Sequence, residues 1–299
     1  MKNDSPTHES VIKKVVSELS GCCFKEITAG ASGKCPTLPS QSIIAEIIEI
    51  CRSVLFPNVF STEQPESATS DYFTGEKCMR LLFLLENQVS CDPSEDKNLL
   101  NANEISLNFL STLPKIRGIL LGDIEATFNG DPAAESSTEV LICYPGMRAI
   151  INYRIAHELY NLGARLIARL ICEIAHSETG IDIHPGAVIG ERFSIDHGTG
   201  VVIGATSIIG NDVKIYQGVT LGAKSFDTDE NNNPIKGIPR HPILGNGVIV
   251  YSNASILGRI TIGDNAVIGG NIWVDENVAP GERLIQARPN NVLRVAPKE

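Results

Sequence analysis

From residue 181 onward an aliphatic residue returns at nearly every sixth position, and this period constrains the fold more than any other feature of the chain. The aliphatic residues occupy positions 183, 189 and 195, then 203, 209, 215 and 221, and finally 244, 250, 256, 262, 268 and 274. A glycine often follows them, and a small or β-branched residue often stands two positions before. Neither an α-helix nor an alternating strand has a period of six, so the pattern indicates a repeat architecture.

A hexapeptide repeat has a direct physical interpretation. Three hexapeptides form a triangular coil of roughly 18 residues, and successive coils stack about 4.8 Å apart through parallel strand pairing. The aliphatic residue points into the coil, the small residue fits the crowded corner, and glycine permits a tight turn. Composition agrees, because 16 of the 26 glycines lie between Gly180 and Gly270 and only 5% of the residues are aromatic. The sequence therefore predicts a left-handed parallel β-helix.

The first part of the chain has helical periodicity instead, so the predicted fold class is α + β, an N-terminal helical bundle followed by the β-helix. We expect a helical domain over 1–178, a β-helix domain over 179–276 with a loop excursion at 223–243, and a C-terminal tail over 277–299. Amphipathic runs predict helices after Ser40 and ending at Pro57, over 79–85, after Pro114, over 145–160 and over 163–176. Loops are expected over 21–39 and 62–70.

Two interruptions of the repeat mark candidate functional segments. Between positions 195 and 203 the spacing is eight instead of six, so two extra residues bulge from the coil around His197. Between positions 221 and 244 a long polar excursion leaves the repeat and ends in Arg240 and His241. Long loops on a rigid scaffold commonly carry function.

His197 is the first candidate for chemistry, because it lies on the bulge beside Asp196 and is followed by glycines. One coil with its two-residue insertion is about 20 residues long, which places Asp182 opposite residue 202 of the next coil. A carboxylate on one imidazole nitrogen fixes the tautomer and raises the basicity of the other nitrogen, as a general base requires. The alternative interpretation is a solvated turn histidine, and spacing alone favours neither.

A metal site is a further alternative, formed by His184, His197 and His241, but these histidines lack the close pair that such sites use. No Cys-x-x-Cys spacing occurs either, so we expect no metal. For Arg240 and His241 two interpretations stand: a loop end tied down by salt bridges, or recognition of an anionic group such as a carboxylate.

Charge and hydropathy exclude other classes. The formal net charge of −10 argues against nucleic-acid binding, which needs a basic face. No apolar run reaches the roughly 18 residues of a membrane span, and the polar first ten residues do not read as a signal peptide. We expect a cytoplasmic protein with no membrane and no nucleic-acid partner.

Four motifs together resemble serine O-acetyltransferases: DIHP at 182–185, IDHGTG at 195–200, QGVTLG at 217–222 and RHP at 240–242. The helical part adds DIEA at 123–126, DPA at 131–133, and Gly146 with YRIAH at 153–157, in the family's order. The resemblance covers roughly 115–290. It implies transfer of an acetyl group from acetyl-CoA to the hydroxyl of L-serine, giving O-acetyl-L-serine for cysteine biosynthesis, without a metal.

The resemblance also implies a role for individual residues. His197 is the general base and Asp182 orients it. The serine amino group is expected at Asp131 and Asp196, and the serine carboxylate at Arg240 and His241. The coenzyme is expected along the prism edge, near Gly222, Ala223, Ser252 and Gly270.

Assembly expectations follow from the same resemblance: a homotrimer through the prism, or a dimer of trimers through the helical half. A complex with O-acetylserine sulfhydrylase is doubtful, because the chain stops at 295–299 (VAPKE) without the terminal isoleucine that docks into that enzyme. Two alternative functions remain: a hexapeptide acetyltransferase acting on a sugar or other small acceptor, and a non-catalytic trimeric scaffold.

Overall fold

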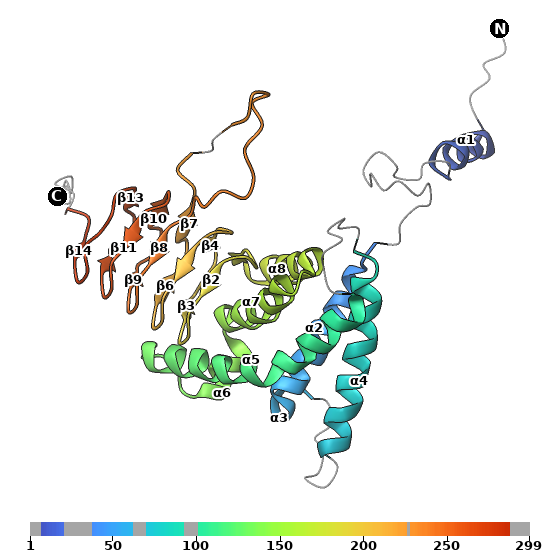
Figure 1. Ribbon diagram of the computed structural model, residues 1–299, viewed down its shortest axis with the longest axis horizontal. Coiled ribbons are helices and arrows are strands. Elements are labelled where there is room, and N and C mark those ends of the chain that lie inside the picture. The colour runs from blue at the N-terminus through green and yellow to red at the C-terminus, as the bar shows by residue number, and fades with distance from the viewer. Residues whose placement is uncertain (1–6, 21–37, 62–69, 93–100, 226–227, 288–299) are drawn as a thin grey trace, which may run out of the picture.

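The computed structural model describes residues 7–20, 38–61, 70–92, 101–225 and 228–287. Helices occupy the first part of the chain and a stack of short parallel strands the second (Figure 1). The helices are α1 (His8–Ser20), α2 (Gln41–Leu55), α3 (Pro57–Phe60), α4 (Ser70–Val89), α5 (Ala102–Gly130), α6 (Ser137–Cys143), α7 (Pro145–Asn161) and α8 (Arg165–Thr179). Within the described residues no helix is both long and apolar enough to cross a membrane.

The helices expected after Ser40 and over 79–85, 145–160 and 163–176 are confirmed as α2, part of α4, α7 and α8. The start expected after Pro114 is wrong, because α5 begins at Ala102 and runs through this proline. A capping box formed by Asn101 and Glu104 starts the helix instead. Pro114 donates no hydrogen bond to the carbonyl of Leu110, one turn earlier, and Leu110 is only partly buried. The expected loops at 21–39 and 62–70 fall mostly on 21–37 and 62–69, which lie outside the described residues.

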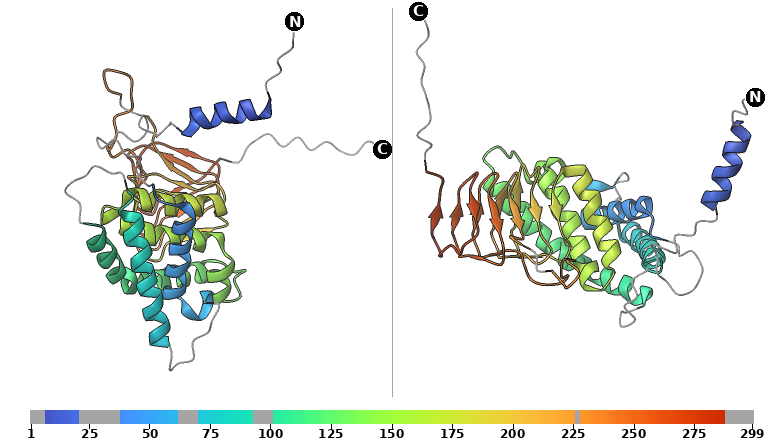
Figure 2. Two further views of the ribbon diagram at one scale, coloured as in Figure 1. Left: turned by 90° about the vertical axis from the view of Figure 1, so that its right-hand side faces the viewer. Right: turned by 90° about the horizontal axis from the view of Figure 1, so that it is seen from above.

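The strands form three parallel sheets that wind into a prism, which confirms the left-handed β-helix (Figure 2). Sheet A contains β1 (Asp182–Ile183), β4 (Val202–Ile203), β7 (Thr220–Gly222), β10 (Ser255–Leu257) and β13 (Trp273–Val274). Sheet B contains β2 (Val188–Ile189), β5 (Ile208–Ile209), β8 (Ile243–Leu244) and β11 (Thr261–Ile262). Sheet C contains β3 (Ser194–Asp196), β6 (Lys214–Tyr216), β9 (Ile249–Val250), β12 (Val267–Ile268) and β14 (Arg283–Leu284). The register places Asp182 opposite Val202, as the residue count predicts.

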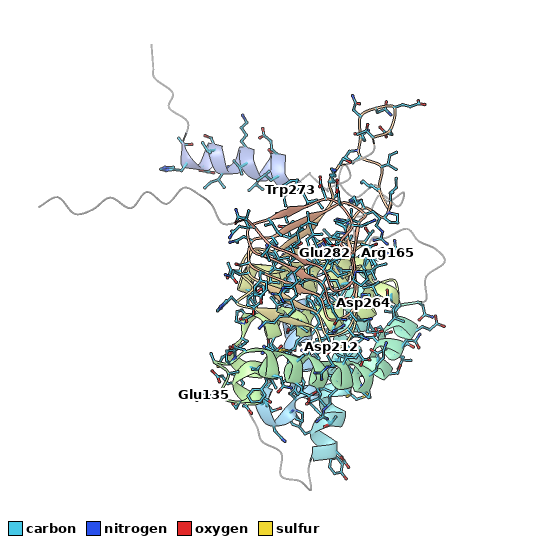
Figure 3. All side chains as sticks on the ribbon, turned by 90° about the vertical axis from the view of Figure 1, so that its left-hand side faces the viewer. Glu135, Arg165, Asp212, Asp264, Trp273 and Glu282 are labelled. Atoms are coloured by element: carbon cyan, nitrogen blue, oxygen red, sulfur yellow. The ribbon has the colours of Figure 1, made fainter. Side chains whose placement is uncertain are left out.

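Three edges join the sheets, and their positions organise the site. The CA edge contains 197–201, 217–219, 251–254 and 269–272; the AB edge contains 184–187, 204–207, 223–225, 228–242 and 258–260; the BC edge contains 190–193, 210–213, 245–248, 263–266 and 279–282. Along the BC edge, Asp212, Asp264 and Glu282 follow one another up the prism (Figure 3). No candidate site residue from the sequence lies on this third edge.

The glycines that follow the aliphatic positions have a different role from the one expected. Gly190 and Gly210 do not have a positive φ, so they do not serve a tight turn. A Cβ on Gly210 would lie 2.8 Å from the backbone of the next coil at Gly245 and Asn246, closer than packing allows. Glycine is therefore required where one coil closely approaches the next.

A buried ion pair joins the helical part to the first coil. Arg154 on α7 contacts Asp123 on α5, with Nε 3.0 Å from Oδ2, and both side chains are almost fully buried. The guanidinium also donates to the carbonyls of Ile189 (2.7 Å) and Gly190 (2.6 Å), while the Phe193 N–H donates to Asp123 Oδ1 (2.9 Å). Helices α5 and α7 are thus fixed against the base of the prism, and one continuous core extends through both parts.

Candidate functional site

His197 projects from the CA edge, where the repeat is interrupted. It has a φ of +58°, and Gly198 follows with a φ of +94°. A side chain on Gly198 would collide with Ile181, so the turn needs glycine for space as well as for conformation. The result is a histidine whose side chain is 73% exposed at the end of β3.

Two carboxylates lie close to His197. Asp196 ends β3, with its Oδ1 3.9 Å from His197 Nε2, and Asp131 follows the last residue of α5. A small hollow between them is lined by Asp131, Asp196, Tyr144, Lys214 and residues of α5 and β3. The structure therefore brings together Asp131, Asp196 and His197, as the sequence predicts.

Hydrogen bonds keep Asp131 charged. The Tyr144 hydroxyl donates to Asp131 Oδ2 (2.7 Å) and the Ala133 N–H donates to Oδ1 (2.8 Å). These two bonds, the one from Tyr144 above all, hold the pKa of Asp131 below its ordinary value. The same bond raises the pKa of Tyr144 to about 12, so the phenol stays protonated at neutral pH.

Arg240 and His241 lie on the AB edge, where the long excursion returns to the prism. His241 is only 7% exposed. The Thr206 N–H donates to His241 Nδ1 (3.1 Å), so the neutral ring carries its proton on Nε2. Burial, followed by the charges of Arg240 and Arg259, lowers the pKa of His241 to about 4. His241 is therefore a neutral hydrogen-bond donor at physiological pH.

A pocket of about 170 Å³ opens beside Arg240 at the root of the excursion. Lys224, Arg240 and Arg259 contribute to its lining together with apolar residues of the loop. Arg259 also donates to the His241 carbonyl (2.9 Å), which ties the loop end to the prism. Three cations thus line this pocket, one of them, Lys224, paired with Asp275 (2.8 Å), whereas two carboxylates lie beside the CA edge.

The three histidines weighed as a metal site do not converge. His184 lies on the AB edge, where its Nδ1 accepts the Gly186 N–H (2.9 Å), while His197 lies on the CA edge. Burial is the main cause that lowers the pKa of His184 to about 4. His184 is therefore part of the packing at the base of the prism.

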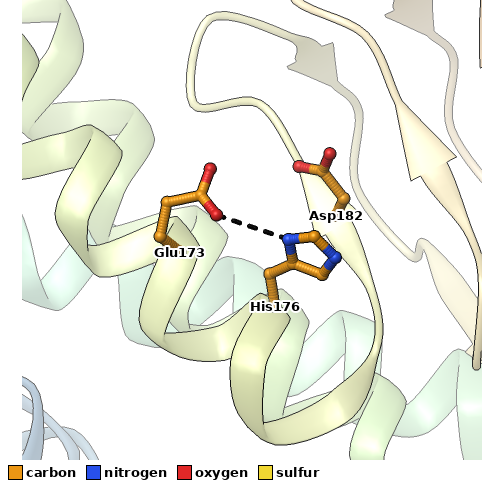
Figure 4. Close-up of side chains that lie close together, drawn as sticks. All are labelled: Glu173, His176 and Asp182. Atoms are coloured by element: carbon orange, nitrogen blue, oxygen red, sulfur yellow. Dashed lines mark hydrogen bonds and ion pairs between the residues drawn. The ribbon is translucent and has the colours of Figure 1, made fainter.

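Asp182 has neighbours that the sequence did not suggest. Its carboxylate lies with Glu173 and His176 of α8, and one ligand atom of each lies within 4.8 Å of the others (Figure 4). His176 Nδ1 is 3.3 Å from Glu173 Oε2. This group has the chemistry to hold a metal ion. Among the described residues, no hydrogen bond joins Asp182 to His197.

The residues expected at the coenzyme lie on two edges. Ser252 and Gly270 share the CA edge with His197, and Gly270 approaches so closely that a Cβ would lie 3.0 Å from the Ser252 carbonyl oxygen. Gly222 and Ala223 lie where β7 leads onto the AB edge. A Cβ on Gly222 would likewise lie 2.8 Å from the Leu257 side chain, so both glycines are required by close packing inside the prism.

Comparison with known proteins agrees with this geometry. No protein-family model matches the chain. A plasmid-encoded serine acetyltransferase of Synechococcus elongatus is 46% identical over 263 residues, covering 84% of this chain and 82% of that protein. The chain belongs to the serine acetyltransferase family.

Solved structures of this family have the same architecture. Entamoeba histolytica serine acetyltransferase 1 in complex with L-cysteine is 36% identical, with a TM-score of 0.73 over 83% of this chain and 87% of that one. Neisseria gonorrhoeae serine acetyltransferase in complex with serine is 28% identical, with a TM-score of 0.55 over 82% and 95% of the two chains. The resemblance seen in the sequence motifs is therefore confirmed.

Three residues of the candidate site escaped the sequence analysis: Tyr144, Thr206 and Lys214. Each contacts a candidate residue, namely Asp131, His241 and Asp196 respectively. Lys214 had a detectable signal, because it is a lone cation at an outward position of an otherwise apolar strand. Tyr144 and Thr206 had none, since their roles depend on how separate segments pack.

Proposed function

We propose that this chain transfers an acetyl group from acetyl-CoA to the hydroxyl of L-serine, producing O-acetyl-L-serine and CoA in cysteine biosynthesis. The observation that carries the proposal is the CA edge, where an exposed histidine stands beside two carboxylates in a chain of this family. A zwitterionic acceptor needs a negative and a positive partner, and the two edges offer both.

His197 is the general base. It takes the proton from the serine hydroxyl as the oxygen attacks the thioester carbonyl carbon. The tetrahedral intermediate collapses, the carbon–sulfur bond breaks, and the imidazolium returns the proton to the leaving thiolate. Asp182 is proposed as the orienting partner of His197, which the register supports by placing it opposite Val202, the first residue of the strand after the His197 turn.

The acceptor's two charged groups have separate partners. Asp131 and Asp196 receive the serine ammonium, and Arg240 with the Nε2–H of His241 receives the carboxylate. In one chain these groups lie on different edges of the prism, with sheet A between them. We therefore propose a site completed between protomers of a trimer, in which the CA edge of one protomer meets the AB edge of the next.

Exposed apolar residues on the prism support such an assembly. Val188 on sheet B is 51% exposed, Ile208 on the same sheet is 39% exposed, and Trp273 on sheet A is 66% exposed. Contact between prisms would remove these side chains from water. The same contact would form a channel for acetyl-CoA that runs parallel to the prism axis. Ser252 and Gly270 of one protomer would line one side, and Gly222 and Ala223 of the next protomer the other.

The test follows release of CoA thiol from acetyl-CoA by the purified protein, with L-serine and with a panel of sugars and simple amines. We expect release that depends on L-serine. Thiol release with a sugar but not with L-serine would show that the acceptor is a sugar. A sugar carries no ammonium or carboxylate, so it would not need the oppositely charged groups of the two edges. No acceptor-dependent release would support the scaffold interpretation and contradict the proposal.

A further inference from the structure

Lys214 joins the two parts of the molecule at the candidate site. It begins β6, and its Nζ lies 2.9 Å from Asp196 Oδ2, with both side chains only 15% exposed. The same ammonium donates to the carbonyl of Gly130 (2.7 Å), the last residue of α5 and the neighbour of Asp131. One cation therefore holds a carboxylate of the prism and the C-terminal end of a helix, where positive charge is favoured.

Tyr144 holds the second carboxylate from another direction. It lies between α6 and α7, and its hydroxyl bonds Asp131 Oδ2, while the Ala133 N–H bonds Oδ1. Each Asp131 oxygen keeps a second lone pair for another donor. Asp131 is thereby fixed in orientation and remains able to bind a cation.

The charges of this group match one ammonium. Asp131 and Asp196 carry two negative charges, and Lys214 carries one positive charge. Although burial works against that charge, the bonds to Asp196 and Tyr216 leave the pKa of Lys214 raised. The net charge of these three side chains is therefore −1, and one protonated amino group, with a charge of +1, would neutralise it. Lys214 occupies Asp196 Oδ2, so Oδ1, the oxygen 3.9 Å from His197, is left for the acceptor.

We propose that Lys214 and Tyr144 are positioning residues that hold Asp196 and Asp131 ready for the α-amino group of the acceptor, and so determine selectivity for an amino acid. This inference rests on the proposed function. Without Lys214, the hollow would be lined by two carboxylates and no cation, and the repulsion between them would favour protonation of one carboxyl group over binding of the substrate. The other titratable groups facing these residues are His197 after β3, Glu139 on α6 and Tyr216 at the end of β6.

The experiment compares Lys214→Met, Lys214→Arg and Tyr144→Phe with the unaltered protein. Steady-state kinetics are measured for L-serine and acetyl-CoA between pH 6 and 9, with 3-hydroxypropanoate, which lacks the amine, as a competitive inhibitor. Lys115→Met is the matched control, because Lys115 forms an ion pair with Glu158 on the surface. Thermal unfolding of each variant reports on folding.

For Lys214→Met we expect the KM for L-serine to rise about 10- to 100-fold, as for loss of a hydrogen bond to a charged group. The KM for acetyl-CoA and the inhibition constant of 3-hydroxypropanoate should stay unchanged. The acid limb of kcat/KM for L-serine should move upward by about one pH unit. Lys214→Arg should restore most of the loss, and Tyr144→Phe should cost about 3- to 10-fold.

Unchanged L-serine kinetics in Lys214→Met and Tyr144→Phe would overturn the inference while leaving the proposed function intact. Equal changes in the constants for L-serine, acetyl-CoA and 3-hydroxypropanoate would overturn it as well, because they indicate a purely structural role. If Lys214→Met does not fold, the inference is decided by the pH dependence of kcat/KM for L-serine in Lys214→Arg and Tyr144→Phe. Absence of serine-dependent turnover in the unaltered protein would overturn both the proposed function and this inference.

Discussion

The CA and AB edges of the same prism are built from similar repeats but differ in how their charged groups are held. On the CA edge, Asp196 is fixed from outside the β-helix, because Lys214 also binds the end of α5. On the AB edge, His241 is fixed by the β-helix alone, through Thr206 and Arg259. The first edge depends on docking of the helices, whereas the second depends on the return of one long loop. A single chain thus contains two half-sites of opposite charge.

The largest expected effect comes from removing the base on the CA edge. His197→Ala should lower kcat by about 10²- to 10⁴-fold, the usual contribution of a positioned general base. His8→Ala, which changes an exposed histidine on α1, is the control and should retain full activity. Thiol release under saturating substrates measures both. Normal turnover in His197→Ala would remove this residue from the mechanism.

Mixed oligomers test whether the two edges belong to one site. When His197→Ala and Arg240→Ala chains are co-expressed in equal amounts, roughly a quarter of the sites in a cyclic trimer combine two unaltered edges. We expect activity to return to about that fraction, although each variant alone is nearly inactive.

A matched pair controls for simple mixing. His197→Ala with Asp131→Ala alters the same edge twice, so no protomer of either kind offers an intact CA edge and activity should not return. Failure of the first mixture to recover activity would mean that the edges do not meet between protomers.

A smaller effect is expected at Thr206. Its Oγ1 accepts the backbone N–H of Arg240 (2.9 Å) and lies 2.8 Å from His241 Nδ1. Thr206→Val keeps the shape and removes the hydroxyl, so the KM for L-serine should rise by up to about tenfold, the value of one net hydrogen bond. Thr7→Val, which changes an exposed threonine just before α1, should leave this KM as it is. An unaltered KM in Thr206→Val would show that the loop end needs no such support.

The smallest expected effect is a difference between the two edges in how stability depends on pH. The folded-state pKa of His184 is about 4, below its ordinary value of 6.5, so the unfolded chain binds more protons between these pH values. Stability should therefore fall as the pH drops from 6.5 to 4. His184→Asn, whose amide oxygen can accept the Gly186 N–H, should show a smaller fall in melting temperature between pH 7.5 and 5 than the unaltered protein.

On the CA edge the sign is the same, but the loss of stability falls in a lower pH range. The pKa of Asp131 is lowered, so its contribution to stability is complete above its ordinary value of 3.8 and is lost only below it. Asp131→Asn should therefore leave the change between pH 7.5 and 5 as it is. An equal pH response of the two variants would contradict this assignment of the shifts.

The repeat made much of the architecture predictable, because a period of six allows few folds and the two-residue insertion alone placed Asp182 opposite Val202. Motifs shared with the family also suggested a group of Asp131, Asp196 and His197; the structure places the three close together, and their roles stay a prediction. The sequence did not separate Arg240 and His241 from them, since residues that bind one ligand in an oligomer need not be neighbours in one chain. The contacts of Lys214 with Gly130 and of Asp182 with His176 depend on how helices dock on the prism, which no local pattern records.

The stacking of coils at a fixed interval has a consequence for how such a protein can change. Position around the prism and position along it are independent coordinates. Under the proposed function, the choice of acceptor is encoded around the axis, in the edges of the lower coils. The length of the acetyl-CoA site is set along the axis, by Ser252 and Gly270 in higher coils. Inserting or deleting one whole coil above β7 would therefore alter donor fit while leaving acceptor selectivity in place.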